Sequence, residues 1–190
     1  CHVEAMFLCG HMLYHGEGVG SNQEESLKFY KKAASKGHLE SMFNYGNMLY
    51  NGEGVPANKI EACQYYKNAA DKGHVEAMFC YAKMVFIGDV VELNKEEAFK
   101  YYKMAADKDH IKAMFNYAKM NYDGDGVAVN REEAFIYYKK AADKGDLKSI
   151  NNYASMLVNM QRNNESEEAY HSYKFAADNE NIEAMYQTAL

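Results

Sequence analysis

Two histidines near the start of the chain have the spacing of a metal-binding pair. His11 and His15 lie four residues apart, so on a helix both side chains would face the same side. Zinc proteases use this spacing together with a glutamate that acts as general base, but only Met, Leu and Tyr lie between these two histidines. The pair lacks the base, and we predict no metal site.

Glycine-rich segments have some features of nucleotide or calcium loops. The segment from Gly16 to Gly20 would cradle phosphate only between a strand and a helix start, whereas it follows a helical pattern and has counterparts further along the chain. The segment Asp123-Gly124-Asp125-Gly126 has Ala134 at the twelfth position, where a calcium loop needs a bidentate glutamate. We assign both segments to turns and predict no cofactor.

The cysteines and the remaining histidines do not form a recognisable catalytic set. Four cysteines and seven histidines allow a Cys–His nucleophile on paper, but no third group is placed to orient it. His38, His74 and His110 recur at one position of a repeat, which indicates a structural turn; a pH-sensing ladder is the alternative. No CxxC spacing points to zinc or a disulfide framework. We predict that the chain is not an enzyme.

Composition limits the partners and the compartment. The 190 residues include 48% apolar and 25% charged residues, one proline and a net charge of −6, which favours a folded, helical chain and disfavours nucleic acid as a partner. No apolar run is long enough to span a bilayer, so no direct membrane insertion is predicted. The unpaired pattern of cysteines favours the cytoplasm. A glycosylation sequon at Asn164-Glu165-Ser166 leaves the endoplasmic reticulum lumen open.

The strongest feature is an internal repeat with a period of 36 residues. The segment YYKNAADKGHVEAMF from Tyr65 returns as YYKMAADKDHIKAMF from Tyr101, and related segments begin at Phe29, Tyr137 and Ser172. Such a period is typical of a solenoid, whose units bury their apolar faces by stacking. The chain begins inside the pattern, so we expect a segment of a longer protein. We predict one array over 1–190, with five copies and a partial sixth at 2–37, 38–73, 74–109, 110–145, 146–180 and 181–190.

Each copy is predicted to contain two helices joined by a glycine turn. In the second copy, apolar residues recur at intervals of three and four between 41 and 50, which is the helical period. A second helix follows Asn58, a favourable N-cap with Glu61 three residues later, and ends at Gly73. The predicted fold class is therefore all-α, an α/α solenoid of helix–turn–helix repeats.

Small residues and methionines mark the expected core. An Ala-Ala pair recurs in each second helix, and small side chains let neighbouring helices approach to about 8–9 Å. One position of the first helix is always Gly or Ala, at 10, 46, 82, 118 and 154. Methionine recurs two residues later, at 12, 48, 84, 120 and 156, and we interpret it as core filler rather than a metal box.

These residues resemble the Sel-1-like repeat, a relative of the tetratricopeptide repeat. The resemblance covers essentially the whole chain and implies a right-handed superhelical solenoid that acts as an adaptor or scaffold without catalysis. The cysteine-rich secreted branch is disfavoured, because the cysteines here do not form a regular pair in each hairpin. In the second copy the motif is carried by Ser41, Tyr45, Gly46, Met48, Tyr50, Gly52, Gly54, Val55, Glu61, Ala62, Tyr65, Tyr66, Lys67, Ala69, Ala70 and Gly73.

One stripe on the first helix of each copy varies between copies. Its positions are spaced four, three and four residues apart, which keeps them on one helical face away from the Met and Tyr stripe. First helices line the concave surface of an α/α solenoid, where asparagines would pair with an extended backbone, and Lys83 and Lys119 with acidic groups. An ordinary solvated face is the alternative. The predicted partner-binding residues are Asn44, Asn47, Asn51, Cys80, Lys83, Asn116, Lys119, Asn152 and Ser155.

The sequence therefore predicts a non-catalytic scaffold or adaptor that binds other proteins or peptides through its concave face, within a larger complex. The alternative is a structural spacer in a cytoskeletal or membrane-associated assembly. A peptide binder predicts loss of binding when the concave face is mutated, whereas a spacer predicts tolerance there and sensitivity at the ends of the array.

Overall fold

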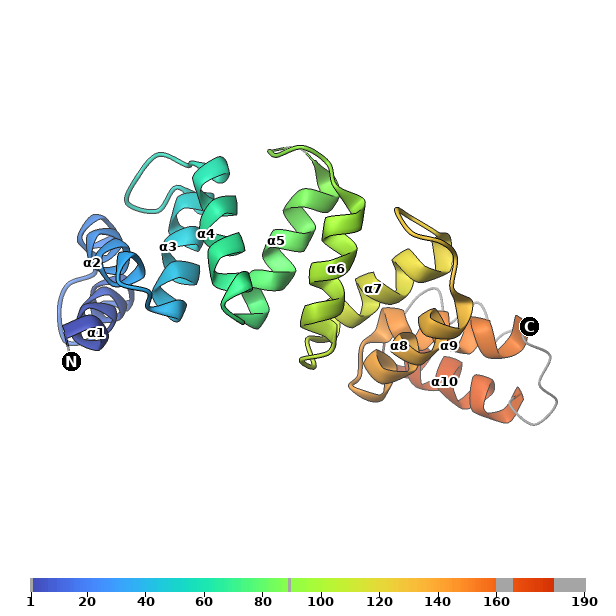
Figure 1. Cartoon of the computed structure of the whole chain (residues 1–190). Helices are drawn as coiled ribbons and strands as arrows, with labels where there is room; N and C mark the ends of the chain where they lie inside the picture. The colour runs from blue at the N-terminus through green and yellow to red at the C-terminus, as the bar shows by residue number, and fades with distance from the viewer. Residues whose placement is uncertain (1, 89, 160–165, 180–190) are drawn as a thin grey trace. The chain divides into compact units, whose positions relative to one another are not determined.

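The structure is a computed structural model that describes residues 2–88, 90–159 and 166–179. The predicted partial sixth copy, Asn164 of the sequon and Cys1 lie outside these residues. The described residues form ten helices and no strand (Figure 1), so the prediction of an all-α repeat fold is confirmed. The helices are α1 (His2–His15), α2 (Gln23–Ser35), α3 (Leu39–Asn51), α4 (Lys59–Asp71), α5 (Val75–Ile87), α6 (Lys95–Ala106), α7 (Ile111–Asp123), α8 (Arg131–Asp143), α9 (Leu147–Asn159) and α10 (Ser166–Asp178).

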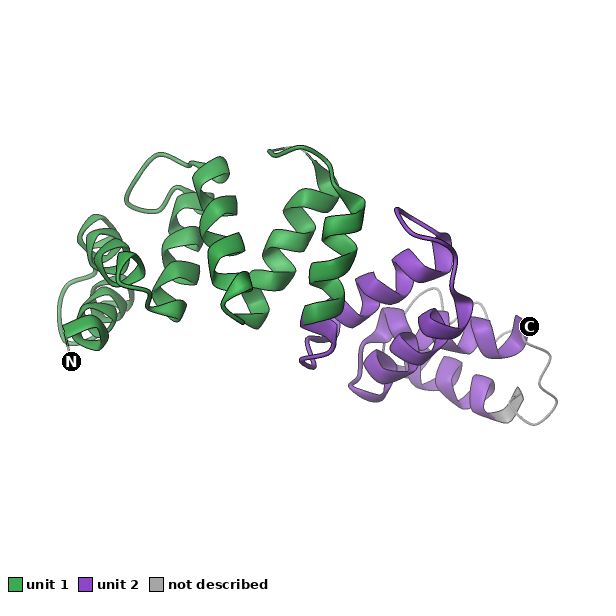
Figure 2. Cartoon of the chain, viewed as in Figure 1, with its two compact units in different colours: residues 1–104 green, residues 105–190 purple. Residues whose placement is uncertain are grey.

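The chain divides into two compact units (Figure 2). Unit 1 spans Cys1–Met104 and holds α1 to α5 with most of α6, and unit 2 spans Ala105–Leu190 and holds the remaining helices. In unit 1, α1 packs on α2 and α3 on α4, while α2 and α4 also contact the helix that follows. In unit 2, α7 packs on α8, α8 on α9 and α9 on α10. Odd-numbered helices are thus the first, and even-numbered helices the second, of each predicted pair.

Side-chain caps set the helix starts. The Asn58 Oδ1 atom accepts a hydrogen bond from the Glu61 backbone N–H at 3.1 Å, as predicted for the second helix. His38 and His74 cap α3 and α5, where each Nδ1 accepts from a backbone N–H at 3.2 and 3.1 Å. The structural role predicted for the recurring histidines is confirmed. In the fifth copy Asp146 takes over this task, with Oδ2 2.8 Å from the backbone nitrogen of Ser149.

The small residues lie where helices touch. A Cβ atom on Gly46 would lie 3.1 Å from Cε1 of Tyr66, and Ala69 and Ala70 are fully buried. Met48, Met84, Met120 and Met156 are buried as predicted, but Met12 is 40% exposed, so its assignment to the core is wrong. The reason is that no described helix precedes α1 to cover it.

Polar joints link successive helix pairs. In unit 1 the Lys67 ammonium on α4 lies 3.1 Å from the Tyr81 hydroxyl on α5 and 2.6 Å from Glu97 on α6. The same joint recurs in unit 2, where Lys139 on α8 lies 2.8 Å from the Tyr153 hydroxyl and 2.9 Å from Glu168. Each joint crosses three helices, so it fixes how one repeat stacks on the next.

Candidate functional site

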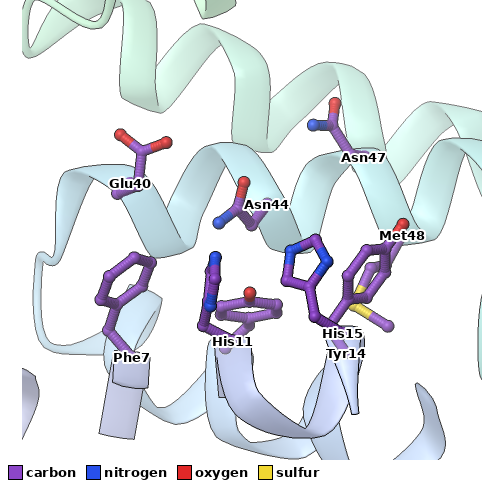
Figure 3. Close-up of a pocket in the computed structure, with 9 residues that line it drawn as sticks. Phe7, His11, Tyr14, His15, Glu40, Asn44, Asn47 and Met48 are labelled. Atoms are coloured by element: carbon purple, nitrogen blue, oxygen red, sulfur yellow. The ribbon is translucent and has the colours of Figure 1, made fainter. Parts of the chain in front are cut away.

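A cavity of about 440 Å³ lies between α1 and α3 in unit 1. The row of Phe7, His11, Tyr14 and His15 on α1 lies opposite the row of Glu40, Asn44 and Asn47 on α3 (Figure 3). Tyr30 on α2 and Met48 on α3 complete the lining. The cavity is thus bounded by aromatic rings from one repeat and by polar side chains from the next.

Helical spacing and one glycine create this arrangement. On α3, Glu40, Asn44 and Asn47 are four and three residues apart, so they share one face of the helix. On α2, the Tyr30 ring packs so closely against α1 that a Cβ atom on Gly10 would lie 2.9 Å from its Cδ1 atom. The absence of a side chain at Gly10 therefore lets the Tyr30 ring take its place beside the cavity.

Carboxylates dominate the charge around the cavity. The Glu40 Oε2 atom lies 3.2 Å from Nε2 of His74, and Glu17 Oε2 lies 3.5 Å from Nδ1 of His11. The Tyr14 hydroxyl donates to Glu53 Oε2 at 2.7 Å. Lysine and arginine are absent from the lining residues of the described structure. The cavity therefore carries acceptors and negative charge without a lysine or arginine to balance them.

Burial and the nearby carboxylates raise the pKa of the two tyrosine hydroxyls at the cavity. Burial is the main cause that raises the pKa of Tyr30 to about 12, and a hydrogen bond with Asn44 opposes the shift. The negative charges of Glu40 and Glu17 raise it further. The hydrogen bond to Glu53 raises the pKa of Tyr14. Both phenols therefore stay protonated at neutral pH, and Tyr14 donates its hydrogen bond to Glu53.

The two histidines of α1 do face the same side, as their spacing predicts. The His11 and His15 ring centroids are 4.3 Å apart, and His11 is in contact with Glu17. Among the residues that the structure describes, no cluster of three His, Cys, Asp or Glu side chains is arranged to hold a metal ion. The histidines are instead part of the aromatic wall of the cavity.

A second, smaller cavity lies at the equivalent place in unit 2. It measures about 70 Å³ and is lined by Tyr122, Tyr138, Asn152, Ser155 and Met156. These positions follow Tyr14, Tyr30, Asn44, Asn47 and Met48 by three repeats of 36 residues. A hydrogen bond between Tyr138 and Asn152 affects the pKa of Tyr138 as the one between Tyr30 and Asn44 affects that of Tyr30. The array thus repeats a Tyr–Asn pair at a cavity.

The other predicted site residues are engaged locally or exposed. The Asn51 amide donates to Glu53 at 2.9 Å, and the Asn116 amide donates to the Lys112 carbonyl at 2.8 Å. Lys119 pairs with Asp123 at 2.5 Å. On α5, Lys83 is exposed and Cys80 is half-buried. The structure therefore brings together Asn44 with Asn47 in one cavity, and Asn152 with Ser155 in the other.

Several cavity residues were missed by the sequence analysis. Phe7, Tyr14, Tyr30 and Met48 line the cavity, although the varying stripe was expected to lie away from the Met and Tyr stripe. That expectation is wrong for α3, where Met48 lines the same cavity as Asn44 and Asn47. The aromatic rings come from α1 and α2, because the cavity is formed between two repeats. A signal was present in the sequence: Tyr14 and Tyr122 occupy the same repeat position.

A further cavity in unit 1, of about 520 Å³, lies under the loop before α6. Two of its charged groups already satisfy one another, because Lys67 pairs with Glu97 and bonds to Tyr81. Burial raises the pKa of the Cys63 thiol at its wall to about 11, so this cysteine is a protonated thiol at neutral pH. The larger cavity is therefore part of the joint between repeats, and the α1–α3 cavity is the better candidate site.

The repeated helix pairs define an all-α solenoid repeat protein. Residues 3–38, 39–74, 75–110 and 111–146 each match the Sel1 repeat. The chain therefore belongs to the Sel1 repeat family, as the motif resemblance indicated. Sel1 repeats generally mediate protein–protein interactions and are generally non-catalytic. A search among proteins of curated function finds no match to this chain.

Solved structures from three bacteria share the fold. A protective antigen present in uropathogenic Escherichia coli strains, which displays an SLR fold, is 24% identical with a TM-score of 0.86, over 98% of this chain and 40% of the antigen. A Sel1 repeat protein from Oxalobacter formigenes is 28% identical with a TM-score of 0.81, over 97% of this chain and 76% of that protein. An immunity protein from Pseudomonas aeruginosa is 19% identical with a TM-score of 0.52, over 92% of this chain and 65% of that protein. This chain thus spans less than half the length of the Escherichia coli antigen.

None of the helices in the described part of the chain combines the length and the apolar character that a membrane-spanning segment needs.

Proposed function

We propose that this chain is a non-catalytic scaffold that holds extended segments of a partner protein along the odd-numbered helices of each unit. The odd-helix face is defined by the varying positions on α3 and α5 in unit 1 and on α7 and α9 in unit 2. Its proposed contact residues are Asn44, Asn47, Asn51, Cys80, Lys83, Asn116, Lys119, Asn152 and Ser155.

The observation that supports this proposal is the recurrence of a cavity at the same repeat positions in both units. Residues that repeat faithfully, such as Ala69 and Met48, are buried and hold the helices together. Four of the residues that vary from copy to copy, Asn44, Asn47, Asn152 and Ser155, line the two cavities, where a partner can reach them. Variation at an accessible and hollowed face is what a binding surface needs and a spacer does not.

The side chains of the odd-helix face suit an extended backbone. Asn47 accepts from the Tyr66 hydroxyl through Oδ1 at 2.7 Å, which leaves its NH₂ group to donate to a partner carbonyl. Asn44 lies one turn earlier on α3, so the two amides can contact the same extended segment. Exposed Lys83 on α5 adds a cation for an acidic group of the partner.

The three described cysteines support a reducing compartment, and we infer the cytoplasm. Cys9, Cys63 and Cys80 are thiols that form no disulfide among the described residues. The partner we infer is a protein or peptide within a larger complex, since the scaffold itself carries no predicted chemistry.

The proposal can be tested by capturing partners from native extract with two matched double variants. Asn44→Ala with Lys83→Glu alters the odd-helix face of unit 1. Asn68→Ala with Lys32→Glu makes the same chemical changes at exposed positions of α4 and α2. Circular dichroism melting curves of both variants must match those of the wild type before binding is compared.

We expect the first variant to lose captured partners and the second to keep them. Equal capture by both variants would contradict the scaffold proposal. That result would favour the alternative hypothesis of a structural spacer, in which contacts lie at the ends of the array or on its even-numbered helices.

A further inference from the structure

The α1–α3 cavity combines a carboxylate, an amide oxygen and aromatic rings. Glu40 and Asn44 lie one helical turn apart on α3, and Phe7 and Tyr14 lie opposite them on α1 (Figure 3). The contact of Glu40 with His74 uses Oε2, so Oε1 is left to accept a hydrogen bond from a ligand. This set places acceptors on α3 opposite aromatic rings on α1.

We propose that the α1–α3 cavity of unit 1 binds an arginine side chain of the partner segment. The guanidinium group presents five donors in a planar fork and stacks on aromatic rings, which matches acceptors that face aromatic side chains. This inference rests on the proposed function, because it names one anchor residue of the segment that the odd-helix face would hold.

The charges around the cavity favour a cation over an anion. Glu40 lines the cavity, while the carboxylates of Glu17 and Glu53 contact the lining residues His11 and Tyr14. These carboxylates also raise the pKa of the hydroxyls of Tyr30 and Tyr14. An acidic side chain would meet these carboxylates without a lysine or arginine in the lining to compensate. A cationic side chain would instead gain charge-assisted hydrogen bonds.

The equivalent region of unit 2 lacks the features that favour arginine in unit 1. The position of Glu40 is occupied by Lys148 in unit 2, and that of Glu4 by Lys112. The equivalent cavity is also far smaller, at about 70 Å³. The arginine pocket is therefore assigned to unit 1 alone.

The test uses three blocked tripeptides and protein with ¹³C-labelled methionine methyl groups. The probes are acetyl-Gly-Arg-Gly-amide, the same peptide with neutral citrulline in place of arginine, and the same peptide with glutamate. Met48 lines the cavity and reports binding, while Met78 is buried on α5 outside the lining and serves as an internal reference.

We expect the arginine peptide to shift the Met48 signal in a saturable manner and leave Met78 unchanged. The citrulline peptide should bind about tenfold more weakly, because it keeps the shape and loses the charge. Equal binding of the arginine and citrulline peptides would overturn the proposal. Binding of the glutamate peptide at Met48, or no saturable shift with arginine, would overturn it as well.

A matched pair of variants separates the pocket from overall charge. Glu4 and Glu40 each contact a capping histidine at 3.2 Å, but only Glu40 lines the cavity. We expect Glu40→Gln to weaken arginine-peptide binding about fivefold and Glu4→Gln to leave it within about twofold. Equal weakening by both variants would overturn the pocket.

The two proposals fail in different ways. If the tripeptide does not bind but Asn44→Ala with Lys83→Glu still loses its partners, the scaffold stands and the arginine pocket falls.

Discussion

The two cavities of the array occupy the same repeat positions and differ in size and charge. The cavity between α1 and α3 measures about 440 Å³, and the one between α7 and α9 about 70 Å³. Both contain a tyrosine from an even-numbered helix that bonds to an asparagine of the next odd-numbered helix. The repeat therefore produces the same arrangement of helices and the same Tyr–Asn pair at both cavities, and we call this shared arrangement the repeat frame.

The difference lies in a few side chains at the surface of the frame. Where unit 1 has His11 and His15 with ring centroids 4.3 Å apart, unit 2 has Lys119 and Asp123, which pair along α7 at 2.5 Å. Where unit 1 has Glu40, unit 2 has Lys148. In unit 2, Lys119 and Asp123 pair with each other on α7, whereas in unit 1 the equivalent residues His11 and His15 line the cavity. Repeats thus keep the frame constant while substitutions on one face change what it can bind.

The largest effect is expected from filling the close contact beneath the unit 1 cavity. In Gly10→Leu the new side chain would meet the Tyr30 ring, since even a Cβ atom would lie 2.9 Å from it. We expect the free energy of unfolding to fall by about 1–3 kcal/mol, as overpacking a core does. Urea denaturation measures this change. The control is Gly20→Leu, where nothing lies within 4 Å of a Cβ atom; equal losses in both variants would refute the packing argument.

A change of charge at one repeat position, Glu40 in unit 1 and Lys148 in unit 2, separates the effect of charge from that of cavity size. In unit 1, Glu40→Lys should weaken arginine-peptide binding by more than tenfold, because it replaces attraction by repulsion in the cavity wall. In unit 2, Lys148→Glu should not create binding, because the cavity remains small. Methionine methyl signals of Met48 and Met156 report the two sites separately, since each lines one cavity. A saturable response of Met156 would show that charge alone sets the difference.

The smallest effect is expected at the polar joints, which the two units share. Lys67 lowers the pKa of Glu97, and Lys139 lowers that of Glu168. A lowered carboxyl pKa stabilises the fold above the ordinary range near pH 4.5, and this stability is lost as the pH falls through the lowered pKa. Because the joints are partly exposed, we expect about 0.2–1 kcal/mol from each.

The measurement is urea denaturation of Glu97→Gln and Glu168→Gln between pH 7 and pH 3. Each variant should be less stable than the wild type at pH 7, and the gap should close toward pH 3. A gap that stays constant with pH would argue against the ion pairs as its cause.

The repeat frame was predictable because it depends on local signals. The Asn58 cap follows from spacing within one copy, and the structural role of His38 and the small residue at Gly46 follow from their recurrence between copies. Helix formation and stacking distance are set by such residues, which recur in every copy. The order of the helix pairs in the described residues could therefore be read from the sequence.

The contents of the cavity were not predictable in the same way. Asn44 was found because it varies on a helical face, but Tyr30 belongs to another helix and Phe7 to another repeat. Asn51 and Asn116 carry the same signal as Asn44, yet both bond to nearby groups. Whether a varying residue is free to contact a ligand depends on the distances between helices. These distances cannot be derived from the spacing of residues along one helix.

The most direct test of the account is a selection of peptides on the intact chain. A library of random linear peptides displayed on phage would be selected on the immobilised protein, and the selected peptides would be measured against Glu40→Gln and Glu4→Gln. We expect peptides that share an arginine and bind the Glu40→Gln variant several-fold more weakly, with little change for Glu4→Gln. Selected peptides that lack a shared arginine, or that bind both variants and the Asn44→Ala with Lys83→Glu variant as tightly as the wild type, would contradict it.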